Sequence, residues 1–287
     1  MYLEHFGLSS APFSLTPDTR FFLELNNARA LFKELLATLN TPNGFMVVRG
    51  KAGIGKTVLC RKLMNALRCH KRRYKLLYIS HPRISEQSFL SAIAHELRLD
   101  ETPLSTLELE VIKALTANVE SGLVNVIVVD EAQSMPDESL ESLRRLADIR
   151  VDSAQLVRVA LFAQPTRRKD LRQSRSRILA DRITVERNLT PLRKSDTGTY
   201  IAMRLTRSGY SGESLFTPKA LRLIGEASEG VPRIINLLAH KSMMLAAESS
   251  LRKIDKQHVK QAIETTDATE KGNRHGAQEW LEKLTGH

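Results

Sequence analysis

The chain has 287 residues, 42% of them hydrophobic, and a net charge of +11. This length allows one large or two moderate folded domains, and the apolar content excludes a disordered protein. No run approaches the roughly 20 apolar residues of a membrane-spanning helix, and the start lacks a secretory signal. The positive charge makes an anionic surface a candidate partner, although a solvated basic face would give the same composition.

Residues 1–43 are predicted to form an entry segment that packs on the domain after it. Turn signals at Pro12 and Pro17 precede leucines at helical spacing, from Leu31 to Leu39. An α/β domain is predicted over 44–191, where short apolar runs alternate with helical patterns. Its predicted strands are 45–48, 75–80, 124–129, 156–162 and 182–189, and its predicted helices are 57–67, 89–97, 104–121, 136–146 and the very basic 166–179.

The pattern changes at Pro191, after which only helical periodicity is present. A small all-α domain is therefore predicted over 192–266, with helices at 195–208, 217–229, 232–249 and 255–266. Residues 267–287 are expected to be a flexible tail. The two cysteines, Cys60 and Cys69, lack metal-ligand spacing, so we expect free thiols in a reducing cytoplasm.

The first motif that carries chemistry is Gly50-Lys51-Ala52-Gly53-Ile54-Gly55-Lys56-Thr57, which fits the phosphate-binding P-loop G-x-x-x-x-G-K-[ST] between a strand and a helix. Its glycines let backbone N–H groups approach a triphosphate, and the following helix adds the positive end of its dipole. Lys56 is expected to reach the β- and γ-phosphates of ATP, and the Thr57 hydroxyl to bind Mg²⁺. The predicted nucleotide-binding residues are Gly50, Lys51, Ala52, Gly53, Ile54, Gly55, Lys56, Thr57, Val58 and Arg233.

Two adjacent carboxylates follow the third predicted strand, Val126-Ile127-Val128-Val129-Asp130-Glu131. The carboxyl ends of parallel strands share one edge of a sheet, so these acids are expected beside the P-loop. Asp130 is predicted to hold Mg²⁺, and Glu131 to act as the general base that activates water.

At this point the chain resembles an AAA+ ATPase, and within that group the general-secretion ATPases typified by ExeA and GspA. The resemblance covers about residues 1–266. It is carried by Phe6-Gly7-Leu8 with Pro12-Phe13 and Thr16-Pro17-Asp18, the P-loop, Asp130-Glu131-Ala132-Gln133, Leu161-Phe162-Ala163-Gln164-Pro165 and Gly230-Val231-Pro232-Arg233-Ile234-Ile235-Asn236. It implies a P-loop NTPase fold with a parallel five-stranded sheet flanked by helices, followed by a small helical lid.

The resemblance also implies further catalytic roles. Gln164 matches the polar sensor of the γ-phosphate or the attacking water, and Arg233 the sensor arginine of the lid. Arg182, or with less support Arg177, matches the arginine finger that completes a neighbouring subunit's site. A finger acting between subunits implies a homo-oligomer when ATP is bound.

One segment departs from the family. Thr166-Arg167-Arg168-Lys169 stands where the family usually continues with Glu-Leu, and residues 157–194 hold eleven Lys and Arg against three acids. The candidate partners of the basic 166–182 helix are DNA, acidic lipid or an acidic protein. No aromatic residue lies in this cluster, which argues against a stacking platform for single strands.

The expected function is a cytoplasmic Mg-ATP-hydrolysing AAA+ ATPase that assembles or remodels a partner complex. By resemblance, the partners are inner-membrane proteins of a type IV pilus or secretion system, which would recruit the chain peripherally. The alternative is an ATP-switched DNA-binding regulator like the transposition ATPases, which the basic composition favours. A third alternative is an adaptor that binds nucleotide without hydrolysing it, against which Glu131 argues.

Overall fold

The computed structural model of the chain describes residues 2–23, 25, 27–80, 85–99, 102–152, 154–165 and 175–266. Two compact units divide the chain. One is formed by residues 17–190, and the other combines residues up to Thr16 with those from Pro191 onward. The chain therefore crosses between the units twice, each time at a Thr-Pro pair, Thr16-Pro17 and Thr190-Pro191.

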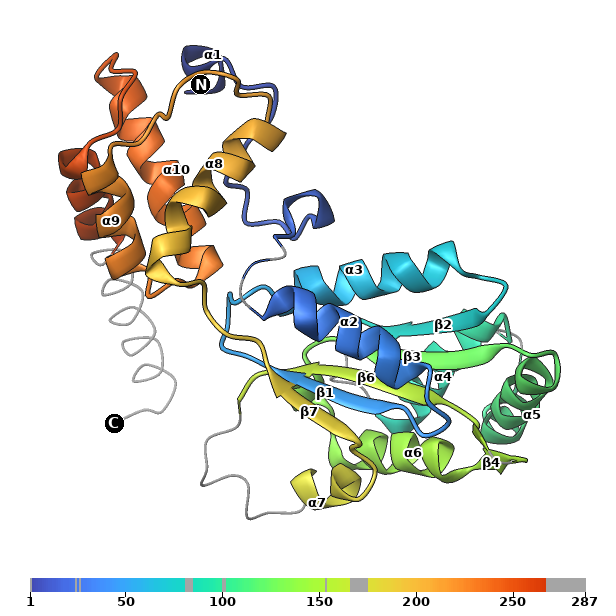
Figure 1. Cartoon of the computed structure of the whole chain (residues 1–287). Helices are drawn as coiled ribbons and strands as arrows, with labels where there is room; N and C mark the ends of the chain where they lie inside the picture. The colour runs from blue at the N-terminus through green and yellow to red at the C-terminus, as the bar shows by residue number, and fades with distance from the viewer. Residues whose placement is uncertain are drawn as a thin grey trace, which may run out of the picture. The chain divides into compact units, whose positions relative to one another are not determined.

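The first unit is built on a parallel sheet, as predicted (Figure 1). Its strands are β1 (Phe45–Arg49), β2 (Tyr74–Ile79), β3 (Val124–Val129), β6 (Arg158–Ala163) and β7 (Val185–Asn188). The strand order is β2-β3-β6-β1-β7, and every neighbouring pair is parallel. This order brings the carboxyl ends of β1, β3 and β6 together at one edge of the sheet. At this edge the P-loop follows β1 and Asp130 follows β3.

Helices cover both faces of this sheet, in agreement with the mostly apolar central strands β1, β3 and β6, whereas the edge strand β7 is largely polar and exposed. On one face lie α2 (Ala28–Leu39) and α3 (Lys56–Cys69), and on the other α4 (Glu86–Leu97), α5 (Leu107–Glu120) and α6 (Asp137–Asp148) (Figure 1). Successive side chains of one strand enter opposite cores. In β3, Val126 and Val128 pack towards α3, whereas Ile127 and Val129 pack on the other side.

Two local features were not predicted from the sequence, and one predicted helix is described only in part. A two-residue hairpin, β4 (Arg150–Val151) with β5 (Ala154–Gln155), was not predicted. The short helical turn η1 (Thr19–Phe21) is capped by Asp18, whose carboxylate accepts from the Arg20 N–H. The predicted basic helix of 166–179 lies largely outside the described residues, and its described part is α7 (Arg175–Ala180).

The second unit is helical, as predicted for the C-terminal region. It contains α1 (Tyr2–Phe6), η4 (Lys194–Asp196), α8 (Thr197–Arg207), α9 (Pro218–Ala227), α10 (Pro232–Glu248) and a last helix at 256–266. The expected cap signals are present. Thr217 accepts a hydrogen bond from the Ala220 N–H, and Asp255 accepts from the N–H of Gln257.

The N-terminal segment packs on this helical unit, whereas residues 1–43 were expected as one segment on the α/β domain. The Tyr2 hydroxyl lies 3.0 Å from His240 Nδ1 of α10, and the Ser9 N–H donates to the Ser208 carbonyl at 2.9 Å. Tyr2, Phe6, Leu8 and Phe13 are all buried. Their aromatic and apolar surface joins the helical core, so the predicted entry segment is divided at Pro17.

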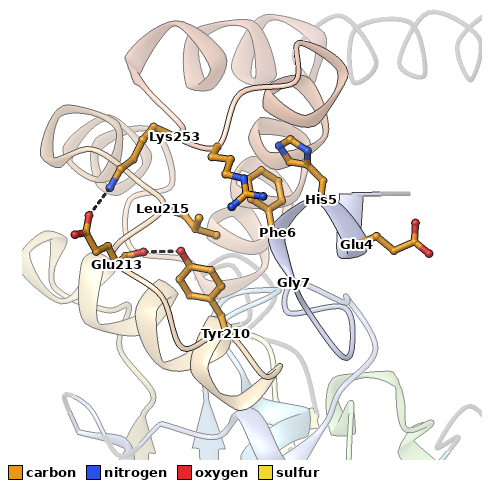
Figure 2. Close-up of a pocket in the computed structure, with 9 residues that line it drawn as sticks. Glu4, His5, Phe6, Gly7, Tyr210, Glu213, Leu215 and Lys253 are labelled. Carbon is orange, nitrogen blue, oxygen red and sulfur yellow. Dashed lines mark hydrogen bonds and ion pairs between the residues drawn. The ribbon is translucent and has the colours of Figure 1, made fainter.

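A pocket of about 330 Å³ lies where this segment meets the loop after α8 (Figure 2). Its lining residues are Glu4, His5, Phe6, Gly7, Tyr210, Glu213, Leu215, Arg252 and Lys253. Polar contacts close one side, because the Tyr210 hydroxyl donates to the Glu213 carbonyl at 2.7 Å and Lys253 Nζ lies 3.4 Å from the Glu213 carboxylate.

The sequence also predicted that the chain has no membrane-spanning helix and that its cysteines are free thiols. Within the described residues, no helix combines the length and apolarity that crossing a bilayer requires. Both cysteines are free thiols: Cys60 is buried in α3, where burial raises the pKa of its thiol, and Cys69 is exposed.

Candidate active site

The P-loop takes the conformation that its glycines allow. Gly53 and Gly55 have φ of 73° and 105°, in the left-handed region that disfavours side chains. A Cβ at Gly50 would lie 2.8 Å from the Ile54 side chain, so this position is closed to larger residues. The loop is anchored to the sheet because the Gly50 N–H donates to the Ala163 carbonyl at the end of β6. The result is a glycine-lined turn that leads directly into the N-terminus of α3.

Lys56, the first residue of α3, is folded back over this turn. Its Nζ donates to the carbonyls of Gly50 at 2.9 Å and Lys51 at 3.1 Å, and only 4% of the residue is exposed. Burial lowers the pKa of Lys56, and the charges of Glu131 and Asp130 oppose that shift. An anionic phosphate bound in the loop could take the place of these two carbonyls as the acceptor for Lys56 Nζ.

Thr57 and Asp130 meet across the edge of the sheet. Asp130 follows β3 and is 5% exposed, and its carboxylate accepts a hydrogen bond from the Thr57 side chain. Burial raises the pKa of Asp130, while the bonds from Thr57 and from the Glu131 N–H partly offset it. A buried carboxylate beside a hydroxyl is an oxygen pair suited to a hard divalent cation.

Glu131 is held by two glutamines. Its backbone has φ of 53°, a strained conformation for a residue with a side chain. One carboxylate oxygen, Oε2, accepts from Gln133 Nε2 and, at 3.1 Å, from Gln164 Nε2. The Gln164 N–H in turn donates to Gln133 Oε1 at 2.8 Å. The structure thus brings together Glu131 and Gln164, which the sequence singled out, and adds Gln133, to which the sequence gave no role.

Comparison with known proteins fits this geometry. Residues 39–171 match the family model of the AAA domain. The fold is that of an AAA+ P-loop protein. Two examples of solved structures with this fold follow. Their sequence identity to this chain is low, so the similarity supports the fold and nothing further. The Aeropyrum pernix ORC2 protein is 18% identical with a TM-score of 0.64, over 91% of this chain and 72% of that one. The Thermotoga maritima RuvB Holliday junction branch migration motor is 19% identical with a TM-score of 0.56, over 85% of this chain and 70% of that one.

A curated relative is similar over most of the chain. General secretion pathway protein A of Aeromonas hydrophila is 34% identical over 257 residues, which is 88% of this chain. The matched region is only 46% of that relative, so the chain spans about half of its length. The AAA domain and its P-loop imply nucleotide binding.

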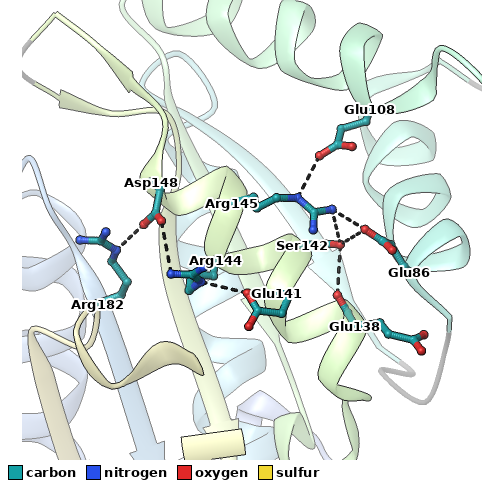
Figure 3. A network of polar contacts seen from close by, with 9 residues as sticks. All are labelled: Glu86, Glu108, Glu138, Glu141, Ser142, Arg144, Arg145, Asp148 and Arg182. Carbon is teal, nitrogen blue, oxygen red and sulfur yellow. Dashed lines mark hydrogen bonds and ion pairs between the residues drawn. The ribbon is translucent and has the colours of Figure 1, made fainter. Parts of the chain in front are cut away.

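Arg182, expected as a finger, belongs to a chain of ion pairs along α6 (Figure 3). Its guanidinium pairs with Asp148, which also lies 4.0 Å from Arg144, and Arg144 pairs with Glu141 at 2.9 Å. The Arg182 side chain is 36% exposed. It therefore sits at the surface of the α/β unit with an acidic partner from its own chain. Arg177 lies in α7, and its side chain is outside the described residues.

A second part of the same network surrounds Arg145 (Figure 3). Arg145 bridges Glu86 of α4 and Glu108 of α5. The Ser142 hydroxyl donates to Glu86 at 2.7 Å, and these two partners, Ser142 first and then Arg145, lower the pKa of Glu86. This network joins three helices on one face of the sheet and does not reach the P-loop.

Arg233 belongs to the helical unit, where it is exposed in the first turn of α10. The P-loop belongs to the other unit. The role of Arg233 as a sensor of the nucleotide therefore remains a prediction.

Some of the described basic side chains of residues 157–194 already form contacts with other residues of this chain. Arg158 is buried, and its Nε donates to the Thr41 carbonyl at 2.8 Å, so it adds nothing to a basic face. Burial lowers the pKa of Arg158. Arg187 pairs with Glu34 at 2.6 Å. Arg167, Arg168, Lys169 and Arg172 lie outside the described residues. Counting Lys and Arg residues in the sequence therefore overstates the positive charge that the described side chains present at the surface.

Proposed function

We propose that the chain is an ATPase that binds Mg-ATP and hydrolyses it. One observation carries this proposal: the carboxylate of Glu131 is oriented by two amides next to the Thr57–Asp130 pair and the P-loop lysine. A protein that only bound nucleotide would need the phosphate loop, but it would not need an oriented base. The ORC2 structure, a protein of the same fold, is described as ADPNP and ADP complexes.

Each residue has a role in this scheme. The N–H groups of the P-loop and Lys56 would bind the phosphates, with Lys56 exchanging its two carbonyl contacts for phosphate oxygens. Thr57 and Asp130 would hold Mg²⁺, which neutralises phosphate charge when bound. Glu131 would accept a proton from the attacking water, and Gln164 would orient that water or the terminal phosphate.

The test separates binding from turnover. Lys56→Ala is expected to lose ATP binding, measured by fluorescence of a labelled ATP analogue. Glu131→Gln is expected to bind normally and to lose turnover by about 10²–10⁴-fold, the range for a general base. Normal turnover by Glu131→Gln would remove the assignment of the base. Failure of the wild-type protein to bind Mg-ATP would remove the proposed function itself.

We propose further that the active unit is a homo-oligomer in which Arg182 enters a neighbour's site. The pairing with Asp148 would then have to open on assembly, so Arg182→Ala is expected to bind ATP but to lose the rise of specific activity with protein concentration. Asp148→Asn, which removes the competing charge, should keep that rise. Equal specific activity of Arg182→Ala and wild type at all concentrations would exclude this role.

For the partner, we propose a membrane-associated type IV pilus or secretion complex. The support is the similarity to General secretion pathway protein A together with the opening Met1-Tyr2-Leu3-Glu4-His5-Phe6-Gly7-Leu8, which resembles that of the MSHA pilus biogenesis protein MshM. Affinity capture with a Glu131→Gln variant, which would retain the ATP-bound assembly, tests this. Recovery of pilus or secretion proteins is expected only with ATP.

The alternative is a DNA-binding regulator switched by ATP. The observation that favours it is charge: residues 35–85 contain eleven Lys and Arg and no acid, and Arg68, Lys71 and Arg72 are exposed where α3 ends. Binding driven by phosphate contacts should weaken steeply with salt. Absence of duplex binding even at low salt would exclude this alternative.

A further inference from the structure

Gln133 uses both ends of its amide at the candidate active site. Its Nε2 donates to Glu131 Oε2, and its Oε1 accepts the Gln164 N–H at 2.8 Å. These two partners lie at the ends of different strands, because Glu131 follows β3 and Gln164 follows β6. A single side chain therefore joins the carboxylate to the backbone of the neighbouring strand end.

The backbone around Gln133 is fixed in place. The residue lies in the helical turn η2 (Ala132–Ser134), which is closed by hydrogen bonds from Ser134 to the Glu131 carbonyl and from Met135 to the Ala132 carbonyl. Met135 is 1% exposed and Ala132 is 6% exposed, so the turn is anchored in the core on both sides of Gln133. The left-handed backbone of Glu131 directly precedes this turn, for which Glu131 is the N-terminal capping residue.

The arrangement leaves the two carboxylate oxygens of Glu131 unequal. Within the described residues, Oε2 receives two amide donors, from Gln133 and Gln164, and Oε1 receives none. A carboxylate held by one oxygen cannot rotate freely, so the other oxygen has a defined direction for accepting a proton. An amide suits position 133 because it supplies one donor and one acceptor and does not titrate.

We propose that Gln133 is a positioning residue for ATP hydrolysis, which holds Glu131 by Oε2, leaves Oε1 for the proton of water, and couples this carboxylate to the end of β6. The proposal rests on the proposed ATPase activity. It explains why Gln164 bonds twice within this group, once through its side chain and once through its backbone. Any displacement of Gln164 by a terminal phosphate is transmitted to Glu131 through Gln133.

Three variants test it. Gln133→Met keeps the length of the side chain and removes both hydrogen bonds, whereas Gln133→Glu keeps the acceptor and removes the donor at neutral pH. Gln87→Met, at an exposed position of α4, is the matched control. Dissociation constants for Mg-ATP are measured with a labelled analogue, kcat and KM by phosphate release, and folding by circular dichroism.

We expect both Gln133 variants to bind Mg-ATP within about twofold of wild type and to lose kcat by about 10- to 100-fold, the effect of misplacing a reacting group by about 1 Å. Gln133→Glu should recover relative to wild type as the pH is lowered, because a protonated carboxyl donates again, and Gln133→Met should not. In a Glu131→Gln background, Gln133→Met should cause no further loss.

The possible outcomes distinguish a failure of the role of Gln133 from a failure of the proposed ATPase activity. Normal turnover by Glu131→Gln would remove the proposed base, and with it the reason for positioning. Loss of turnover in Glu131→Gln together with wild-type kcat in Gln133→Met would overturn the role of Gln133 alone. If Gln133→Met folds poorly, Gln133→Glu decides, since a purely structural role predicts that Mg-ATP binding and kcat fall together, whereas a positioning role lowers kcat alone.

Discussion

Arg204 is a buried arginine of the helical unit whose replacement should cost stability. Only 5% of it is exposed, yet its guanidinium is charged. It donates to the carbonyls of Pro12 and Ser14 and, at 2.7 Å, to the Tyr200 hydroxyl. The side chain thus ties the N-terminal segment to α8, and Tyr200 extends the link to Asn236 of α10 at 2.9 Å.

The magnitude follows from what Arg204→Met leaves behind. Methionine keeps much of the apolar stem but leaves two buried acceptors, the Pro12 carbonyl and the Tyr200 hydroxyl, without the Arg204 donor, each costing about 1–3 kcal/mol. Relief of the desolvation of a buried charge offsets part of this. We therefore expect a loss of about 2–4 kcal/mol in the free energy of unfolding.

The assay is urea unfolding followed by far-ultraviolet circular dichroism, with Arg222→Met as the control. Arg222 is exposed on α9 of the same unit, and its replacement should change stability by less than about 0.5 kcal/mol. A loss below about 1 kcal/mol for Arg204→Met would refute the reasoning, because it would mean that the N-terminal segment does not depend on this side chain.

Three further predictions concern the α/β unit. Burial raises the pKa of Asp130, so its protonated form is favoured in the folded protein and stability falls as the pH rises through the folded pKa. Asp130→Asn should therefore raise the melting temperature at pH 7 without nucleotide and abolish further stabilisation by Mg²⁺ with ATP. Gly55→Ala, at φ of 105°, should cost about 1–3 kcal/mol and weaken ATP binding, as thermal shift and titration would show. Asn125→Leu should cost about 2–3 kcal/mol in urea unfolding, because the buried amide donates to the carbonyls of Leu115 and Leu156. Unchanged stability in any of these variants would contradict its stated cause.

The sequence predicted the elements that depend on local signals. The β-branched run of β3, the glycines of the P-loop and the cap of α9 each specify their structure within a few residues. The five-stranded parallel sheet followed from these runs and from the resemblance to the AAA+ fold.

Contacts between distant residues were not predictable in this way. Nothing near Tyr2 indicates that its hydroxyl will meet His240, so the packing of the first residues on the helical unit was not predicted. Arg158 was counted with a basic face although the register of β6 buries it beside Thr41. Gln133 was quoted in a motif without a role, because its role depends on the left-handed backbone of Glu131 and on Gln164 from another strand.

The two Thr-Pro crossings between the units have a consequence for synthesis on the ribosome. Residues 1–16 leave the ribosome before all of 17–190, but the helices that they pack against follow only after Pro191. At roughly 5–20 residues per second, the buried aromatic side chains of this early segment wait about 9–35 seconds for their partners. The α/β unit has its whole sequence available in that interval and can fold first. The nascent chain would then carry an apolar segment that has not yet met its packing partners, which a chaperone is suited to shield.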